Sequence, residues 1–361
     1  MRIVNCATVA KHSTERLQVT FRAIATVAVS ASLLAGCAAG TRPADDHSAA
    51  ATGAAARAPV RIGVVLNALD NPFFVAVYEG ARAEVGRRGA RATMRSVISN
   101  AELREQAAQV RALHPEQPDC YVVNPITATN LVGALRGARG PIVDIDSPVD
   151  PVAARRAGVR IRTYIGTDDV AAGRLAGAHM AALLPSGGEV ALVGGLAGNV
   201  NNGRRLQGFA QGIRGSRLRV VARTNADYNR TKAEIAAEQM LRAHPRIAGF
   251  FAASDLMALG IADALRAAGK TGKVRIIGLD GIAEALDAVA SGAISATVSQ
   301  YPYVMGEMAI EACVAAARGA TLPARVDAPI ALLTRANVAR AIAAFPRPVA
   351  PYRDPFPALL R

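Results

Sequence analysis

Large aromatic side chains are scarce in this chain of 361 residues. Tryptophan is absent, and phenylalanine and tyrosine together supply only 4% of the residues. Each remaining ring is therefore more informative than in an average protein. The hydrophobic share of 51% is still large enough for a sizeable core, and the length allows two domains of ordinary size.

Lysine is also scarce, although the chain is strongly basic. The formal net charge of +14 comes from 42 Lys and Arg residues against 28 Asp and Glu residues, and arginine supplies nearly all of the positive charge. An excess of arginine, alanine and glycine is what GC-rich codon usage produces. The sequence has neither a nucleic-acid reader motif nor a clustered basic face. We therefore expect no nucleic-acid partner.

Cysteine is sparse, and its spacing does not point to a metal site. Three of the four cysteines are Cys37 near the N-terminus, Cys120 at the start of an expected strand and Cys313 on an expected helix. We expect Cys120 and Cys313 to be buried free thiols, with a disulfide between them as the alternative. The histidines show no paired metal-ligand spacing either, so we expect neither a metal nor another cofactor.

The N-terminal apolar run, Ala23–Leu34, is too short to span a bilayer comfortably. It follows a basic leader and ends in Leu-Ala-Gly-Cys, so residues 1–36 are predicted to be an export signal. The final four letters resemble a bacterial lipobox, which implies that Cys37 becomes the lipidated first residue of a membrane-anchored chain. An ordinary secretory signal cut nearby is the alternative. Residues 37–58, rich in Ala, Gly, Thr and Pro, are expected to form a flexible tether.

From Val60 onward, short apolar runs alternate with amphipathic segments, a pattern typical of parallel α/β sheets with right-handed crossovers. The first series predicts strands at 61–66, 91–97, 119–123, 141–145 and 161–165, and helices at 73–88, 100–113 and 127–138. The second predicts strands at 188–193, 217–223, 247–251, 274–278 and 294–299, and helices at 169–184, 203–213, 230–243, 254–268 and 282–290. A helix at 302–318 and an apolar run at 329–333 follow. The α/β fold is therefore expected to have two doubly wound, Rossmann-like lobes with a cleft between them, and the Pro-punctuated residues 338–361 are expected to be a loosely ordered tail.

The stretch Asp70–Phe74 (Asp-Asn-Pro-Phe-Phe) joins the first expected strand to the first expected helix. Pro72 suits a first helical turn because its missing N–H is no loss there. Phe73 and Phe74 then lie beyond the carboxyl end of a strand, where parallel α/β sheets bind ligands. The two rings could face a flat ligand or plug the top of the sheet, and their position alone does not decide between these interpretations.

Polar side chains follow nearly every expected strand. Carboxylates accept hydrogen bonds from vicinal hydroxyls, Arg and Gln donate to hydroxyl lone pairs, and aromatic rings cover the C–H faces of a sugar. Each residue taken alone is at least as well explained as a helix N-cap, but together they predict a pocket for a flat ligand with many hydroxyls. The positions are Asp144, Asp146, Asp168, Asp169, Asn199, Asn201, Asn202, Arg204, Arg205, Asp227, Tyr228, Asn229, Ser254, Asp255, Asp280 and Gln300.

A series of motifs between Arg61 and Asn337 resembles a known family. The motifs are Asn71-Pro72-Phe73-Phe74, Tyr164-Ile165-Gly166-Thr167-Asp168-Asp169, Arg205-x-x-Gly208-Phe209, Ala226-Asp227-Tyr228-Asn229-Arg230, Ser254-Asp255-Leu256-Met257-Ala258-Leu259-Gly260, Gly278-Leu279-Asp280-Gly281 and Gln300. In this order and spacing they resemble the ribose-type sugar-binding receptors of ABC importers, within the type I periplasmic binding proteins. The resemblance implies two lobes joined by a three-segment hinge near 166–168, 299–301 and 327–330. The first lobe would be 59–167 plus 301–327, and the second 168–300 plus 328–337.

The same resemblance implies which residues bind the ligand. They are Asn71, Phe73, Phe74, Asp146 and Ser147 from the first lobe, and Asp169, Arg205, Tyr228, Ser254, Asp280 and Gln300 from the second lobe and hinge. The sequence departs from the ribose pattern where Ser147 replaces an arginine, Ser254 an asparagine and Leu279 an aromatic residue. The loss of a bidentate donor and a stacking wall points away from ribose and towards another pentose, a hexose, a furanose or a linear polyol. Asp144 is expected either to add a contact or to face solvent.

The function implied by the resemblance is capture of a sugar or polyol by hinge closure and its delivery to an ABC importer permease, by a monomeric lipoprotein in the periplasm or on the cell surface. A receptor that feeds a sensor or chemotaxis system would use the same binding chemistry and stays open. A carbohydrate-acting enzyme is a remote alternative, since no nucleophile elbow or paired metal histidines occur and Gly269-Lys270-Thr271 lacks the earlier glycine of a P-loop. A transcription regulator would need an N-terminal helix-turn-helix where this chain has an export signal.

Overall fold

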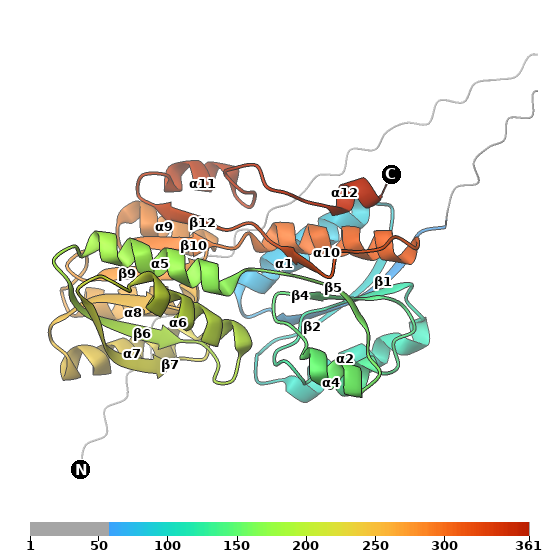
Figure 1. Ribbon diagram of the computed structural model, residues 1–361, viewed down its shortest axis with the longest axis horizontal. Coiled ribbons are helices and arrows are strands. Elements are labelled where there is room, and N and C mark those ends of the chain that lie inside the picture. Colours follow the sequence, from blue (N-terminus) through green and yellow to red (C-terminus); the bar gives the residue numbers. More distant parts are fainter. Residues whose placement is uncertain (1–57, 361) are drawn as a thin grey trace, which may run out of the picture. The chain divides into compact units, whose positions relative to one another are not determined.

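The computed structural model describes residues 58–360, and within them the chain forms two six-stranded sheets (Figure 1). The strand order is β11-β5-β4-β3-β1-β2 in the first sheet and β12-β10-β9-β8-β6-β7 in the second. The strand pairs are parallel except for β10 with β12, which is antiparallel. We call the parts built around these sheets the first lobe and the second lobe.

The strand bounds agree with the predicted apolar runs to within two residues at most ends. The first sheet contains β1 (Arg61–Ala68), β2 (Arg91–Val97), β3 (Cys120–Val123), β4 (Ile142–Ile145), β5 (Ile161–Gly166) and β11 (Arg325–Asp327). The second contains β6 (Gly188–Gly194), β7 (Leu218–Asn225), β8 (Ile247–Ala252), β9 (Arg275–Asp280), β10 (Ala296–Ser299) and β12 (Ala331–Thr334).

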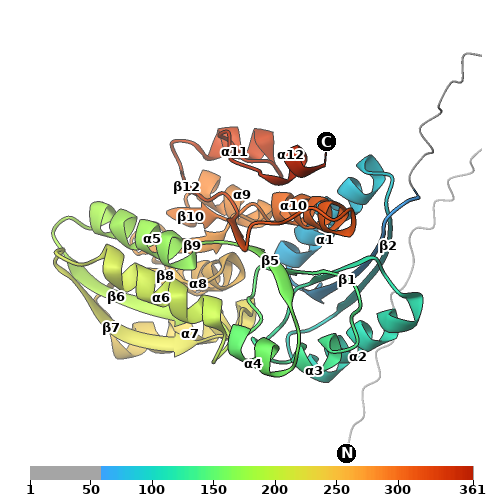
Figure 2. The same cartoon turned by 45° about the vertical axis from the view of Figure 1, so that its right-hand side comes forward.

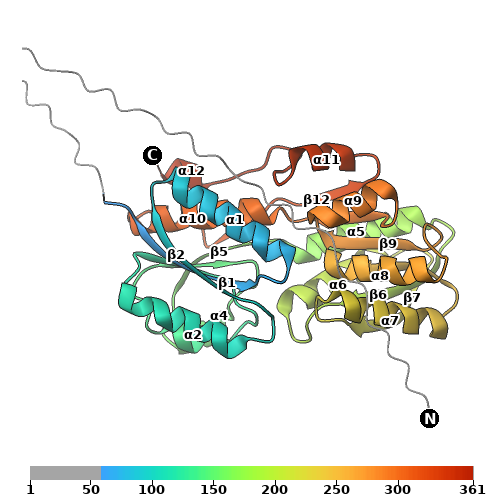
Figure 3. The same ribbon diagram turned by 180° about the vertical axis from the view of Figure 1, so that it is seen from behind.

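Helices cover both faces of each sheet (Figures 1 and 3). In the first lobe, one face carries α1 (Pro72–Arg87) and α10 (Pro302–Ala317), and the other carries α2 (Leu103–Leu113), the short 3-10 helix η1 (His114–Glu116), α3 (Val132–Leu135) and α4 (Pro151–Arg156). In the second lobe, α5 (Asp169–Leu183) and α6 (Val200–Gly212) cover one face. The other face carries α7 (Arg230–Ala243), α8 (Asp255–Ala267) and α9 (Ala283–Ser291).

Paired glycines bring α1 and α10 close together. A Cβ added at Gly80 would collide with the carbonyl oxygen of Tyr303, and one at Gly306 would collide with that of Val77. The two backbones can therefore touch, and larger side chains at either position would force them apart. This contact fixes the start of α1, with its two phenylalanines, beside the segment through which the chain enters α10.

The chain passes between the two sheets three times, from β5 into α5, from β10 into α10 and from β11 to β12 (Figure 2). The predicted fold class, two doubly wound lobes joined by a three-segment hinge, is confirmed. The individual lobe boundaries after residues 167, 300 and 327 stay a prediction.

Two stretches between β3 and β5 differ from the predicted elements. The helix expected at 127–138 is reduced to α3, because Asn130 accepts a hydrogen bond from the Thr127 N–H (3.1 Å) and donates to Gln106 Oε1 (2.7 Å), which holds the preceding residues in a loop. The short helix α4 was not predicted, although Asp150 caps it by accepting from Ala153 N–H (2.6 Å) and Pro151 occupies its first turn.

The C-terminal residues are not the loosely ordered tail that the prolines predicted. Residues 338–344 form α11 (Val338–Ala344), which packs against α9, and residues 356–359 form α12 (Phe356–Leu359), which packs against α10. Phe356 is fully buried, and Arg347 donates two hydrogen bonds (2.8 and 2.6 Å) to the buried carboxylate of Glu307. The prolines interrupt secondary structure, but the side chains between them still find partners on the first lobe.

Cys120 and Cys313 form a disulfide, which corrects the expectation of two free thiols. Their Cα atoms lie 5.6 Å apart, on β3 and α10, a separation that suits a disulfide. The residues are 193 positions apart in sequence, and nothing in their spacing shows that α10 packs onto β3. A disulfide at this place is compatible with an oxidising compartment.

Some predictions concern residues that lie outside the described part of the chain. They are the export signal at 1–36, the lipid-attachment residue Cys37 and the tether at 37–58 apart from its last residue. Among residues 58–360, we find no helix that is both long enough and apolar enough to cross a membrane.

We predict that Phe356→Ala lowers the free energy of unfolding by about 3 kcal/mol, because a fully buried ring is removed. Denaturant unfolding measures the change. The matched control is Phe345→Ala, whose side chain is 43% exposed and whose removal should cost less than about 0.5 kcal/mol. Equal effects of the two variants would show that the C-terminal segment is not packed as described.

We predict that reduction lowers the free energy of unfolding by about 2–4 kcal/mol, because the disulfide closes a long loop in the unfolded chain. The double variant Cys120→Ala/Cys313→Ala should be insensitive to reductant. Peptide mapping without reduction should recover the two cysteines in one cross-linked pair, and their recovery as separate thiols would refute the pairing.

Candidate functional site

The carboxyl ends of strands from both sheets face one small cavity of about 30 Å³ between the lobes. In the conformation described, this cavity has room for only a few water-sized groups. Its walls combine amide, hydroxyl, carboxylate and guanidinium groups with two phenylalanine rings. The lining residues are Asn67, Asn71, Phe73, Phe74, Asn100, Ile126, Asp146 and Ser147 from the first lobe, and Leu196, Asn199, Asn201, Arg205, Tyr228, Ser254 and Asp280 from the second.

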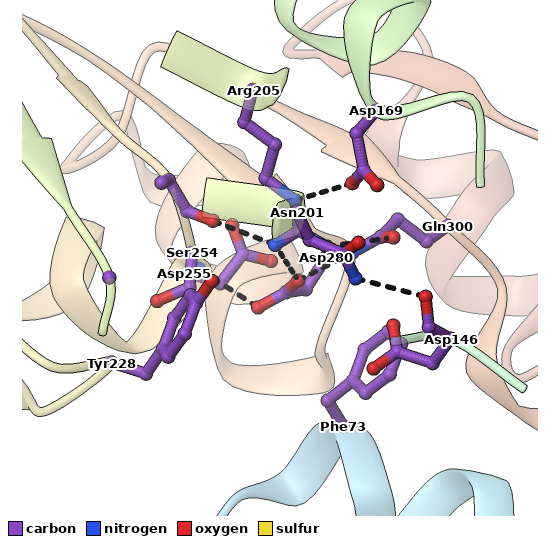
Figure 4. A network of polar contacts seen from close by, with 12 residues as sticks. Phe73, Asp146, Asp169, Asn201, Arg205, Tyr228, Ser254, Asp255, Asp280 and Gln300 are labelled. Atoms are coloured by element: carbon purple, nitrogen blue, oxygen red, sulfur yellow. Dashed lines mark hydrogen bonds and ion pairs between the residues drawn. The ribbon is translucent and has the colours of Figure 1, made fainter. Parts of the chain in front are cut away.

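Nine of the eleven predicted ligand-binding residues line this cavity. The other two, Asp169 and Gln300, lie behind Arg205 and contact its guanidinium (Figure 4). The sequence does not distinguish residues that line the cavity from residues that hold Arg205 in place. Both kinds of residue follow the ends of strands. A direct ligand contact by Asp169 or Gln300 stays a prediction.

Arg205 lies on α6, is 4% exposed and uses all three of its nitrogens. Its Nε donates to Asp169 Oδ1 (2.7 Å), its Nη1 to the Ala253 carbonyl (2.8 Å) and its Nη2 to Gln300 Oε1 (3.1 Å). Asp280 Oδ1 lies 3.5 Å from Nη1. Burial alone would lower the pKa of Arg205, but the surrounding carboxylates, Asp169 foremost, raise it, so the guanidinium stays charged.

Asp280 ends β9 and joins the hinge to the second lobe. Its Oδ1 accepts from Gln300 Nε2 (2.7 Å) and its Oδ2 from the Asp255 N–H (3.2 Å). Burial raises the pKa of Asp280 well above its ordinary value, while Arg205 opposes the change. Its φ of +145° is rare for a residue other than glycine and indicates backbone strain at the site.

Asp146 follows β4 in the first lobe and is 5% exposed. Its Oδ2 accepts from Asn124 Nδ2 (3.2 Å) and from the Ser147 hydroxyl (3.4 Å). Burial raises the pKa of Asp146 to about 6; Arg205 partly opposes this and Asp169 adds to it. Its backbone is in the left-handed region at φ +57°, and its carbonyl accepts from the Tyr164 hydroxyl.

Asn201 connects the two lobes. It lies on α6 in the second lobe, and its Nδ2 donates to the backbone carbonyl of Asp146 in the first lobe (3.0 Å; Figure 4). The lobes therefore touch across the cavity in this conformation. The side-chain oxygen of Asn201 is buried and has no hydrogen-bond partner among the described residues.

Several cavity residues are also helix N-caps. Asn71 Oδ1 accepts from the Phe73 N–H (3.0 Å) and Ser254 Oγ from the Met257 N–H (3.4 Å). Asn199 Oδ1 caps α6 by accepting from the Asn202 N–H (3.0 Å) and also accepts from the Tyr228 hydroxyl (3.0 Å). Capping and ligand binding are thus not exclusive: Asn71 Oδ1 caps α1, while its side-chain NH2 has no hydrogen-bond partner among residues 58–360.

Phe73 and Phe74 combine the two alternatives that the sequence left open. They are 3% and 7% exposed and belong to the core of the first lobe, yet both line the cavity. Their ring centroids are 5.2 Å apart and the rings are nearly perpendicular, at 88°. Each ring supports the other, so that an apolar wall faces the cavity in a fixed orientation.

Asp144 neither adds a contact in the cavity nor faces solvent, so both alternatives expected for it are wrong. It is 2% exposed and does not line the cavity; its Oδ2 accepts from the Val149 N–H (2.7 Å). Burial raises its pKa well above the ordinary value. Residues two apart on a regular strand point to the same face of the sheet. Asp146 has a positive φ and so departs from strand geometry, and its carboxylate does not lie on the same face as that of Asp144.

Some residues that line the cavity were not among the predicted ligand contacts, and the sequence gives a signal for only some of them. Asn199 and Asn201 stand in the polar run after β6 and were recognised only as members of that run. Asn67 lies within β1 and Asn100 in a loop after β2, and no sequence signal separates them from ordinary structural residues. Within residues 58–360, no group of three or more His, Cys, Asp and Glu side chains is arranged to hold a metal ion.

We predict a pH-dependent stability difference between the wild type and Asp146→Asn. The pKa of Asp146 is raised from 3.8 to about 6 in the folded protein, so its stabilising effect is complete below about pH 4 and is lost as the pH rises through about 6. Relative to the variant, the ligand-free wild type should lose about 3 kcal/mol over this window.

Denaturant unfolding at a series of pH values measures this difference. Asp119→Asn is a control of opposite sign, since the hydrogen bond from Arg61 lowers the pKa of Asp119 and its stabilising effect is lost as the pH falls. A constant difference between wild type and Asp146→Asn at all pH values would contradict the described burial of Asp146.

Comparisons with known proteins agree with this architecture. A family model described as a periplasmic binding protein domain matches residues 62–321. The ribose import binding protein of Bacillus subtilis (strain 168) is 32% identical over 279 residues, which is 76% of this chain and 87% of the relative. The D-allose-binding periplasmic protein of Escherichia coli (strain K12) is 32% identical over 272 residues, covering 74% of this chain and 88% of the relative.

Solved structures show the same similarity. An ABC transporter periplasmic solute binding protein from Actinobacillus succinogenes 130z, with bound D-allose, superposes with a TM-score of 0.74 at 25% identity and covers 78% of this chain and 99% of its own. An ABC transporter solute binding protein from Mycobacterium smegmatis, with bound glycerol, gives a TM-score of 0.72 at 29% identity over 79% and 97% of the two chains. The chain therefore belongs to the periplasmic binding protein family, whose members are exported solute receptors and not enzymes.

Proposed function

We propose that this protein captures a sugar or polyol between its two lobes and delivers it to the permease of an ABC importer. The observation that carries the proposal is the cavity itself, to which both lobes contribute hydrogen-bonding groups and the first lobe an apolar wall. Hydroxyls of the ligand would donate to Asp146 and Asp280 and accept from Arg205, and a C–H face would lie against Phe73. The related proteins named above, with ribose and allose in their names, support this class of ligand.

Hinge closure explains how binding becomes a signal. A ligand that contacts both lobes binds the closed form better than the open form and shifts the equilibrium by that difference in affinity. The hydrogen bond from Asn201 to the Asp146 carbonyl already links the lobes, and a ligand would add contacts in parallel. The closed surface is then what the permease recognises.

The ligand is proposed to differ from ribose. Ser147 and Ser254 line the cavity with short side chains where the ribose pattern has an arginine and an asparagine. Leu279 is fully buried in the core of the second lobe and does not reach the cavity, so it supplies no stacking surface. Tyr228 is the aromatic residue of the second lobe at the cavity. A pentose other than ribose, a hexose, a furanose or a linear polyol is the proposed class.

The cellular setting is proposed from the N-terminal sequence. We propose that Cys37 is lipidated, that the tether at 37–58 holds the two-lobed part near the membrane, and that the protein acts as a monomer. A receptor that signals to a sensor or chemotaxis protein is the alternative. Uptake of the ligand by membrane vesicles with and without the protein separates the two, because only a transport component changes uptake.

We predict that a true ligand raises the melting temperature of the purified protein, since it binds the folded state and not the unfolded chain. A thermal-shift screen of pentoses, hexoses, polyols and nucleosides measures this. A complete screen without any shift would count against the proposed function.

We further predict that Asn201→Ala weakens binding of the identified ligand about 10-fold, because it removes both a hydrogen bond between the lobes and a polar side chain that lines the cavity. Titration calorimetry measures the affinity. The matched control is Asn225→Ala, at an exposed position at the end of β7, which should bind like the wild type. Identical affinities for both variants would show that Asn201 contributes neither to closure nor to the binding surface.

A further inference from the structure

The charges around the cavity are unbalanced. Three carboxylates, those of Asp146, Asp169 and Asp280, are 5%, 1% and 3% exposed, and one guanidinium, that of Arg205, is buried among them. Asp255, fully buried behind Asp280, is a fourth carboxylate. Its two oxygens accept from Thr297 Oγ1 (2.6 Å) and from the N–H groups of residues 281 and 282 (2.6 and 3.1 Å), so local donors compensate it.

Arg205 is the one buried basic side chain among the residues that the structure describes, and its ion pairs lie within the second lobe. Arg205 pairs with Asp169 at 2.7 Å and with Asp280 at 3.5 Å, and both partners belong to the second lobe. Within residues 58–360, no basic side chain forms an ion pair with Asp146; its carboxylate receives only the Asn124 amide and the Ser147 hydroxyl, both on Oδ2. The other oxygen, Oδ1, accepts no hydrogen bond from the described residues although Asp146 lines the cavity. A buried carboxylate without a cation is costly.

The neighbours of Asp146 are arranged as acceptors. Asn201 donates its amide hydrogen to the Asp146 backbone, which leaves its own buried oxygen unpartnered at the same place. Ser147, which also lines the cavity, donates its hydroxyl hydrogen to Asp146 and keeps its lone pairs. Phe73 lines the same cavity as Asp146, and an aromatic face attracts cations. A group with several hydrogen donors and a positive charge matches this surface, and an ammonium has three donors and no acceptor.

We propose that the ligand carries a protonated amine that binds between Asp146 and Asn201, which makes amino sugars or amino polyols the substrate class; this rests on the proposed function. The amine would lie beside Asp146 in the part of the cavity that Ser147 also lines. The remaining hydroxyls of the ligand meet Arg205 and Asp280 on the opposite wall.

The test compares matched ligands that differ in one group. The purified protein is titrated near pH 7, where a sugar amine is mostly protonated, with the 2-amino-2-deoxy forms of glucose, galactose and mannose, with their parent hexoses and with their N-acetyl derivatives. We expect at least one amine to bind about 10-fold or more tightly than both its parent and its N-acetyl form, since each tenfold step in affinity is the scale of one good charged contact.

Variants test whether the preference for the amine depends on the charge of Asp146 or on the shape of the cavity. Asp146→Asn removes the charge, and Ser147→Arg supplies a cation from the protein; each should reduce the ratio between amine and parent hexose to about 1 or below. Asp119→Asn, which removes a carboxylate that does not line the cavity, is the control and should keep the wild-type preference. Thermal unfolding without ligand, together with binding of a parent hexose, establishes that each variant is folded.

The outcomes distinguish the two proposals. If every parent hexose binds as tightly as its amine in the wild type, or if Asp146→Asn keeps the preference for the amine, the inference is wrong and the proposed sugar receptor stands. If none of these compounds binds, and the wider screen of sugars and polyols also gives no shift, the proposed function itself fails.

Discussion

The buried guanidinium of Arg205 is the interaction on which the arrangement of the second lobe around the cavity depends. It joins α6 to α5 through Asp169, to the end of β8 through the Ala253 carbonyl, and to the hinge through Gln300. Four separate pieces of chain are thus held in one geometry by one planar group with donors in fixed directions. Removing the group would leave buried carboxylates unpaired, so the site and the fold of this lobe cannot be separated at this residue.

Two cavity aspartates stand in backbone conformations that favour glycine. Asp146 and Asp280 both follow or end a strand, and their φ values of +57° and +145° turn the chain out of the sheet at that point. The strain has a consequence for Asp146: its side chain leaves the alternation of β4, while Asp144, two residues earlier, stays buried against the Val149 N–H. The structure around both residues must supply the energy for this, through the Tyr164 hydroxyl at Asp146 and the Gln300 amide at Asp280.

Residues at strand ends could be predicted from the sequence because topology places them. A run such as Ile-Ile-Gly-Leu before Asp280 shows a buried strand, and parallel strands bring their carboxyl ends to one edge. The same reasoning applies to Asp146 and Ser254, whereas Arg205 lies within α6 and was singled out by the resemblance of its motif. It could not locate Asn67, inside a strand, or Asn100, in a loop, because their place in the cavity results from how two lobes meet.

The errors have the same origin. The pairing of Cys120 with Cys313 and the burial of Phe356 depend on contacts between segments that are far apart in sequence. Proline-rich composition correctly indicated broken secondary structure after residue 344, but composition carries no information about whether a side chain such as Arg347 finds Glu307. Local signals therefore predicted the elements and the edge at which the site lies, while long-range packing decided which residues complete it.

The division of charge between the lobes bears on when the hinge closes. In the proposed hinge motion, Arg205, Asp169 and Asp280 would move together on the second lobe, so their mutual attraction would change little as the lobes approach. Asp146 belongs to the first lobe and becomes buried at the meeting surface without a cation of its own. In the proposed hinge motion, closing an empty cavity removes water from this carboxylate and gains only contacts such as that with Asn201. A ligand that donates hydrogen bonds or positive charge to Asp146 offsets this cost, and the closed form is favoured when the ligand is present.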